Sequence, residues 1–341
     1  MTTSAFSTSE PTGVSDNWLA RIAVRVILTL LWAGASVAAS WQTLGLGLDY
    51  RQYANFYWNL AANWATPEAR FEPGIKLWAM ISQNGLNLSF EWFMWTFIAT
   101  ALGIKFALLA SRTAIPPLAA LVYMCVFYPV LEYTQIRAGM GIALVFIGVF
   151  DYLDGRWKRS LVFFTCAIAF HYSMAAPAIV VLGSAIVRTR VRLLLVIVLV
   201  GFLALALGNI IDGAVEVLNQ VNPLTARYVY NLEQTEGANI LSVWNIAILF
   251  VAMFGVAFGL YEEDRTNQVL ILMSIAAFTS IVVFRNSVEL ALRLREVFSL
   301  STVFFAFRQP AVPWRWIPAS ILLIAGAYVF LFNNVGQTIL F

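Results

Sequence analysis

Apolar runs long enough to cross a lipid bilayer follow one another along most of the chain. A helix needs about 20 mainly apolar residues to cross the hydrocarbon core. Candidate spans are residues 22–41, 90–111, 116–133, 138–153, 191–211, 241–260, 267–284, 289–307 and 316–333. Only 11% of the 341 residues are charged, whereas a soluble domain has about 25%. The sequence therefore predicts an all-α polytopic membrane protein with about 9 to 12 transmembrane helices.

Two further segments predict helices that are broken or re-entrant. Residues 73–88 are too short and too polar for a full crossing, which favours a re-entrant or interfacial helix. Residues 160–187 are interrupted by the stretch His171-Tyr-Ser-Met-Ala-Ala-Pro177, and basic clusters flank them on both sides. If both clusters face the cytoplasm, this segment forms two short helices that meet near His171 at the outer leaflet.

The distribution of arginine and lysine predicts the orientation of the chain. Cytoplasmic loops carry an excess of these residues, which places Arg112, Arg265, Arg308 and the two clusters around residues 160–187 inside. Residues 1–20 are polar and are predicted to form a disordered cytoplasmic tail. Residues 21–341 then form a single transmembrane domain, and its C-terminus is outside if residues 73–88 do not cross the membrane. Outer loops at residues 42–72 and 212–240 provide room to bind a substrate.

Several arginines fall where this orientation does not expect them. The ones outside or in the outer half of the membrane are Arg51, Arg70, Arg137, Arg227, Arg285, Arg293 and Arg295. An ionisable group at the bilayer centre costs roughly 2.5 to 3.5 kcal/mol on insertion scales, so it usually faces a polar cavity. Converging guanidinium groups can hold a pyrophosphate by bidentate hydrogen bonds. The alternative for Arg137 is that it snorkels to lipid phosphate.

Other polar residues also have a catalytic and a structural interpretation. On one helix, Arg285, Glu289, Arg293 and Glu296 would share a face, either as catalytic groups or as ion pairs that neutralise one another. His171, the only histidine, can act as a general base or can satisfy a carbonyl freed by Pro177. A last group fits either sugar binding or an interfacial aromatic belt: Asp49, Tyr50 and Tyr53.

Metal and soluble-cofactor chemistry lack the residues they need. The chain has one histidine and two cysteines without a Cys-x-x-Cys spacing, and it has no Asp-x-Asp or Glu-x-x-His pair. Glycine-rich nucleotide motifs are absent from the sequence too. The basic residues form short clusters between apolar runs, which is typical of membrane orientation and does not suggest nucleic-acid binding. We therefore predict no metal site, no cofactor and no nucleic-acid partner.

Four short motifs in order resemble the EpsG-type, Wzy-like family of polysaccharide polymerases. They are Asp49-Tyr-Arg-Gln-Tyr53, Glu72-Pro-Gly-Ile75, Ile136-Arg-Ala-Gly-Met140 and Ala169-Phe-His-Tyr-Ser173, with softer matches at Arg227-Tyr-Val-Tyr230 and near Arg293. The resemblance covers residues 45 to 300. One departure is Gly141, where the family usually has alanine, and we expect it to loosen helix packing at most.

The resemblance implies an inverting, metal-independent glycosyltransferase of the GT-C type in a bacterial inner membrane, with a cytoplasmic N-terminus. Its substrates would be oligosaccharide repeat units on undecaprenyl pyrophosphate and a growing glycan chain at the outer face. Membrane lipid surrounds it, and a chain-length regulator or a flippase is a further candidate partner. The implied roles are catalysis by His171 and Arg137, pyrophosphate binding by Arg137, Arg285 and Arg293, and sugar or acceptor binding by Asp49, Tyr53, Glu72 and Arg227.

Two other functions remain open from the sequence. An O-antigen-type ligase needs the same pyrophosphate clamp and base, but it transfers finished glycan to another acceptor. A non-enzymatic flippase or transporter for lipid-linked sugars should line a continuous path with charges, whereas the intramembrane charges here gather toward one face.

Overall fold

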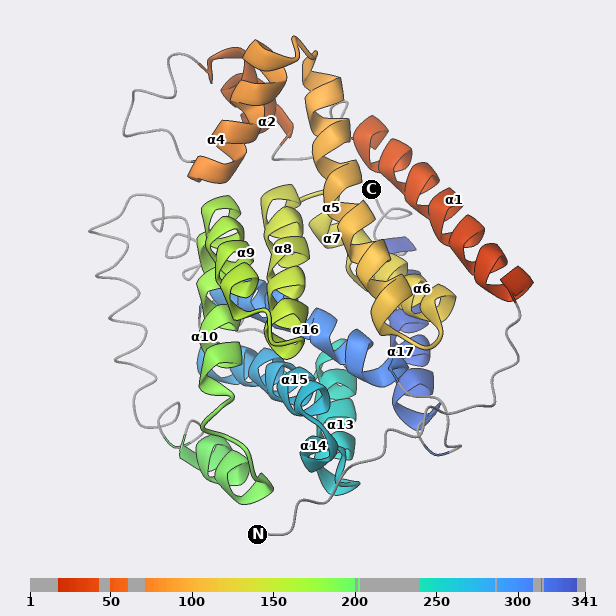
Figure 1. Ribbon diagram of the computed structural model, residues 1–341, viewed down its shortest axis with the longest axis vertical. Helices are drawn as coiled ribbons and strands as arrows, with labels where there is room; N and C mark the ends of the chain where they lie inside the picture. The colour runs from red at the N-terminus through yellow and green to blue at the C-terminus, as the bar shows by residue number, and fades with distance from the viewer. Residues whose placement is uncertain are drawn as a thin grey trace.

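A computed structural model of the chain describes residues 18–42, 50–60, 71–199, 202, 239–285, 287–308, 314 and 316–335. In these ranges the chain is helical and forms no strand (Figure 1), which confirms the all-α prediction. Among the described helices, four are long and apolar enough to cross a membrane: Ile22–Ala39 within α1, Phe90–Arg112 (α5), Ile136–Leu153 (α8) and Arg265–Val283 (α15). The protein is therefore a multi-pass membrane protein.

The remaining described helices are mostly shorter. They are α2 (Tyr50–Trp58), α4 (Pro73–Met80), α6 (Pro116–Val126), α7 (Tyr128–Leu131), α9 (Trp157–Phe170), α10 (Ala175–Gly183), α13 (Val243–Ala257), α14 (Leu260–Glu263), α16 (Val288–Phe307) and α17 (Trp316–Val329), and the full α1 spans Trp18–Gln42. Of the predicted span 191–211, the structure describes residues 191–199 as helical and also Phe202. The predicted tail at residues 1–17 lies outside the described residues.

Two predicted spans are split by their own sequence. The span 116–133 divides at Phe127 into α6 and α7, because Pro129 in the first turn of α7 has no N–H to donate to the carbonyl four residues earlier. The span 241–260 divides into α13 and α14 at Gly259, whose φ of 81° suits glycine better than any other residue. At each break the chain ends one helix and begins a second, shorter one.

The predicted break near His171 is confirmed, whereas the re-entrant or interfacial location of residues 73–88 stays a prediction. Helices α9 and α10 are separated by His171 in extended conformation (φ −159°, ψ 120°) and by one 3-10 turn, Tyr172–Met174. Helix α4 continues as a π-helix over Ile81–Gly85. Helix α4 and its π-helical continuation together extend about 20 Å at 1.5 Å per residue, which is less than the roughly 30 Å of a hydrocarbon core. Figure 1 shows α2 and α4 beyond the ends of α8 and α9.

Polar contacts join one set of helix ends, which we call the Arg112 end. Arg112 forms two hydrogen bonds to Asp154, of 3.1 and 2.6 Å, and so ties α5 to the end of α8. This guanidinium lowers the pKa of the Asp154 carboxyl. Arg308 binds Asp264 at 2.8 Å and ties α16 to α15. The predicted gathering of Arg112, Arg265 and Arg308 at one end is therefore confirmed, and its cytoplasmic location stays a prediction.

Candidate active site

Arg137 lies in the first turn of α8, at the opposite end from Arg112. Its Nε donates a hydrogen bond to the Tyr53 hydroxyl at 3.1 Å, and its Nη1 forms an ion pair with Glu72. The guanidinium also lies 5.1 Å from the ring centre of Phe71, which adds a cation–π contact. The Arg137 and Glu72 side chains are 21% and 8% exposed. Helices α2, α4 and α8 thus bring three predicted site residues together in a largely buried polar cluster.

His171 joins this cluster from the break between α9 and α10. Its Nδ1 lies 3.1 Å from the Ser173 hydroxyl and 4.0 Å from Glu72 Oε1. On the other side of the ring, Nε2 lies 3.4 Å from Nη1 of Arg293, which belongs to α16. We call Tyr53, Glu72, Arg137, His171 and Arg293 the Arg137 cluster. It places a carboxylate and an imidazole between two guanidinium groups.

The contacts of His171 define one arrangement of its ring proton. A neutral imidazole carries one N–H and one lone pair. Since Arg293 can only donate, the Nε2 contact requires the lone pair there and leaves the hydrogen on Nδ1. That hydrogen can be donated to the Ser173 hydroxyl and points toward Glu72, at the distances given above. The backbone N–H of Ser173, 3.4 Å from Nδ1, donates to that nitrogen only in the opposite tautomer, in which the hydrogen on Nε2 would face the Arg293 N–H. The ring therefore presents a basic Nε2.

Two glycines let the motif helices approach one another. A Cβ at Gly74 would lie 2.8 Å from the carbonyl oxygen of Ala169, so glycine is needed where α4 meets α9 beside His171. A Cβ at Gly141 would lie 2.8 Å from Cγ of Met174, which is fully buried. Our expectation for Gly141 was wrong: the residue allows closer packing of α8 against the His171 turn than alanine would, because alanine's extra atom has no space.

One predicted site residue does not join the cluster, and two others cannot be placed in it. Asp49 and Arg227 lie outside the described residues, so their roles stay predictions. Arg285 is exposed in the turn between α15, which ends at Val283, and α16, which begins at Val288. The expectation that Arg285 shares one helical face with Arg293 is therefore wrong, because the helix ends between them. Among the described residues, no three His, Cys, Asp or Glu side chains are grouped as metal ligands.

A buried ion pair behind Arg137 has no counterpart in the sequence predictions. Lys105 in α5 donates to Glu132 Oε1 at 2.5 Å, and both side chains are fully buried. The Tyr123 hydroxyl donates to the same oxygen at 2.5 Å. A Cβ at Gly139, two residues after Arg137, would lie 3.4 Å from the Lys105 ammonium. Glu132 is the acidic residue closest to Arg137 in sequence, but it binds this lysine and holds the chain before α8.

Removing the lysine should destabilise the protein. Lys105→Met leaves the Glu132 carboxylate buried without its cation, which costs about 3 to 5 kcal/mol in typical buried pairs. We expect a lower thermal unfolding midpoint for the variant in detergent, measured by the fraction that stays monodisperse after heating. The double variant Lys105→Met with Glu132→Gln should regain part of the loss. An unchanged midpoint in the single variant would show that the pair does not hold the fold.

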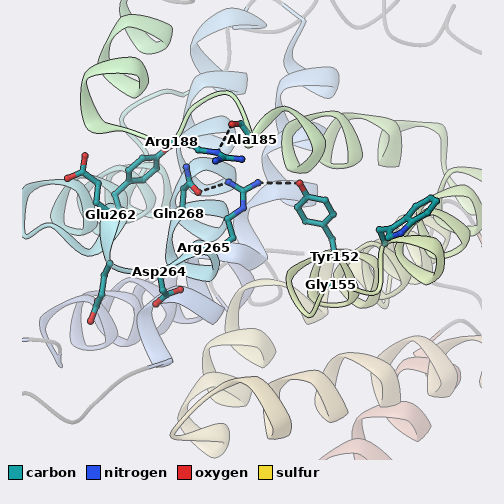
Figure 2. A pocket seen from close by; sticks show the side chains of 11 residues that line it. Tyr152, Gly155, Ala185, Arg188, Glu262, Asp264, Arg265 and Gln268 are labelled. Carbon is teal, nitrogen blue, oxygen red and sulfur yellow. Dashed lines mark hydrogen bonds between the residues drawn. The ribbon is translucent and has the colours of Figure 1, made fainter. Parts of the chain in front are cut away.

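The Arg112 end contains a cavity of about 770 Å³ that is separate from the Arg137 cluster (Figure 2). Along α8, Arg137 and Leu153 are about 24 Å apart at 1.5 Å per residue. Arg265 in this cavity already binds the Ser184 hydroxyl, Tyr152 and Gln268 at 2.9, 3.2 and 2.6 Å. The other charged residues that line the cavity are Arg188, Glu262, Glu263 and Asp264. The Arg265 donors are satisfied by residues of α8 and of the end of α10 as well as of α15 itself, so this guanidinium holds the helix ends together.

Comparison with known proteins gives one family match. The profile of the EpsG family matches residues 24–337, nearly the whole chain. The matched region includes every described member of the Arg137 cluster. Searches of curated proteins and of solved structures return no match.

Proposed function

Since the chain belongs to the EpsG family of Wzy-like polysaccharide polymerases, we propose that its Arg137 cluster joins oligosaccharide repeat units carried on undecaprenyl pyrophosphate. In this proposal the chain is an inverting, metal-independent glycosyltransferase of the bacterial inner membrane with its cluster at the outer face. The outer location is supported by the basic residues at the Arg112 end, because such residues favour the cytoplasmic side.

The reaction breaks one bond and forms one bond. A hydroxyl oxygen of the acceptor sugar attacks the anomeric carbon of the donor, and the bond from that carbon to the diphosphate oxygen breaks. The diphosphate leaves with the electron pair, so negative charge grows on it. Fixed guanidinium groups in a dry site stabilise such charge strongly. Arg137 and Arg293 are the two that flank His171, and they supply positive charge without a divalent ion.

The acceptor hydroxyl must lose its proton during the attack. His171 Nε2 is the proposed base, and the resulting imidazolium is stabilised by Glu72, 4.0 Å from Nδ1. In the described structure Arg293 lies against Nε2. When a donor diphosphate draws Arg293 toward its oxygens, Nε2 becomes available to the hydroxyl. The observation that carries the proposal is this juxtaposition of His171 with two guanidinium groups, one of them paired with Glu72.

An assay on purified protein tests the proposal. The protein is incubated with lipid-linked single repeats and EDTA, and the glycans are resolved by size. We expect a ladder of products that contain two or more repeats. A ligase would leave single repeats unjoined but would transfer them or finished glycan to a different acceptor, and a transporter would leave all glycosidic bonds unchanged. Either outcome would overturn the polymerase proposal.

A further inference from the structure

Helix α16 directs two arginines to opposite sides. Consecutive residues of an α-helix are about 100° apart, so Arg295 points about 200° away from Arg293. Arg293 contacts His171, whereas Arg295 Nη1 lies 3.4 Å from the Asn245 amide oxygen and Nη2 lies 3.4 Å from Glu296 Oε1. Both distances are at the long limit of hydrogen bonding. Arg295 Nε is buried and has no hydrogen-bond partner among the residues that the structure describes.

Arg295 lines a pocket of about 480 Å³ on its side of α16. The pocket lies where α13 begins and α17 ends, and Val130 of α7 forms part of its wall. Asn239 and Ser242 add polar groups to the lining. Its rim includes Leu241, which is 75% exposed, so an apolar surface borders the opening. The pocket thus combines a largely buried guanidinium, on a side chain that is 17% exposed, with an apolar rim suited to lipid.

We propose that this pocket binds the diphosphate head group of a second lipid-linked substrate. A buried guanidinium with incompletely satisfied donors in a membrane protein is costly, and a phosphate oxygen satisfies such donors by short, charge-assisted hydrogen bonds. The apolar rim allows a lipid tail to remain in the bilayer while its head group enters. The Arg137 cluster and the Arg295 pocket therefore lie on the two sides of α16.

The assignment of the two substrates rests on the proposed function. Joining two repeats brings together two lipid diphosphates with different fates. The donor's diphosphate leaves, so it needs the guanidinium groups beside His171. The acceptor's diphosphate stays attached to its glycan and takes no part in bond breaking. A separate site for it needs no imidazole, and none of the described residues that line the Arg295 pocket is a histidine.

Counting bound lipids tests the second site directly. Native mass spectrometry of the detergent-solubilised full chain with excess undecaprenyl pyrophosphate should show two bound molecules. Arg295→Gln removes the charge but keeps an amide that can bond Glu296 and Asn245, and it should bind one. Val130→Trp fills the pocket without changing charge and should also bind one. The matched control Arg25→Gln, an exposed arginine near the start of α1, should still bind two.

Further arms separate other sources of phosphate and other failures. If excess phosphatidylglycerol displaces the second molecule, the pocket is a phospholipid site and the proposal fails. Inorganic diphosphate alone should not displace it, because it lacks the tail. If both pocket variants still bind two molecules, the proposal fails as well. If the wild-type chain makes no polymer but each pocket variant binds one lipid fewer than the wild type, the second lipid site is confirmed and the proposed function fails.

Kinetics distinguish an acceptor site from a structural one. A charge-assisted hydrogen bond contributes about 1.5 to 3 kcal/mol, equivalent to a tenfold or greater change in binding. Arg295→Gln should therefore raise the KM for the acceptor about tenfold and leave the KM for the donor unchanged. An equal rise in both constants would assign Arg295 to the fold instead.

Discussion

Arg137→Ala is expected to reduce polymer formation by about 100- to 1000-fold, which is the range seen when one preorganised donor is removed from a developing negative charge. The guanidinium is positioned by the Tyr53 hydroxyl at 3.1 Å, by the ion pair with Glu72 and by the face of Phe71. Because it is fixed before substrate arrives, little reorganisation is needed when the diphosphate leaves. Cells that carry the variant should accumulate single repeat units on the lipid carrier.

Two matched variants separate loss of chemistry from loss of fold. Arg112→Ala removes an arginine of the same charge whose partner Asp154 lies at the other end of α8, and it should leave polymer length unchanged. Arg137→Lys keeps the positive charge but lacks the planar fork, so its activity should lie between those of the wild type and Arg137→Ala. Full-length polymer from a correctly inserted Arg137→Ala protein would remove Arg137 from the reaction.

Arg137 and His171 could be found from the sequence because a membrane penalises charge. An ionisable residue within an apolar run needs an explanation, and the interruption of residues 160–187 by the stretch from His171 to Pro177 already predicted a helix break there. The motif order added Glu72 and Tyr53. Packing of α2, α4, α8 and α9 then brings these residues together.

The ion-pair partners of the buried charged residues were not predictable from the sequence in the same way. The sequence places Glu132 nearest to Arg137, yet Arg137 pairs with Glu72 across 65 residues, and Glu132 pairs with Lys105 across 27. Such pairs depend on which helix faces meet, and both carboxylates are equally plausible until the helices are packed. Arg285 shows the same limit at short range, because four-residue spacing predicts a shared face only if one helix continues through it.

Replacing His171 should cause a loss of similar size for a different reason. A positioned general base contributes about 100- to 10,000-fold, so His171→Ala should leave single repeats unjoined although undecaprenyl pyrophosphate still binds. Binding is retained because Arg137 and its Glu72 partner remain in place. The measurements are polymer length and lipid-carrier binding on the same purified protein.

A glutamine at this position tells a base from a hydrogen-bonding residue. His171→Gln can still bond to the Ser173 hydroxyl and to Arg293, but its amide cannot accept a proton at working pH. If Nε2 takes the proton of the acceptor, His171→Gln should be as inactive as His171→Ala. Ser173→Ala, which removes only the 3.1 Å contact to Nδ1, should cost about tenfold or less. Substantial activity in His171→Gln would mean that the imidazole only positions Arg293, and another group would have to remove the proton.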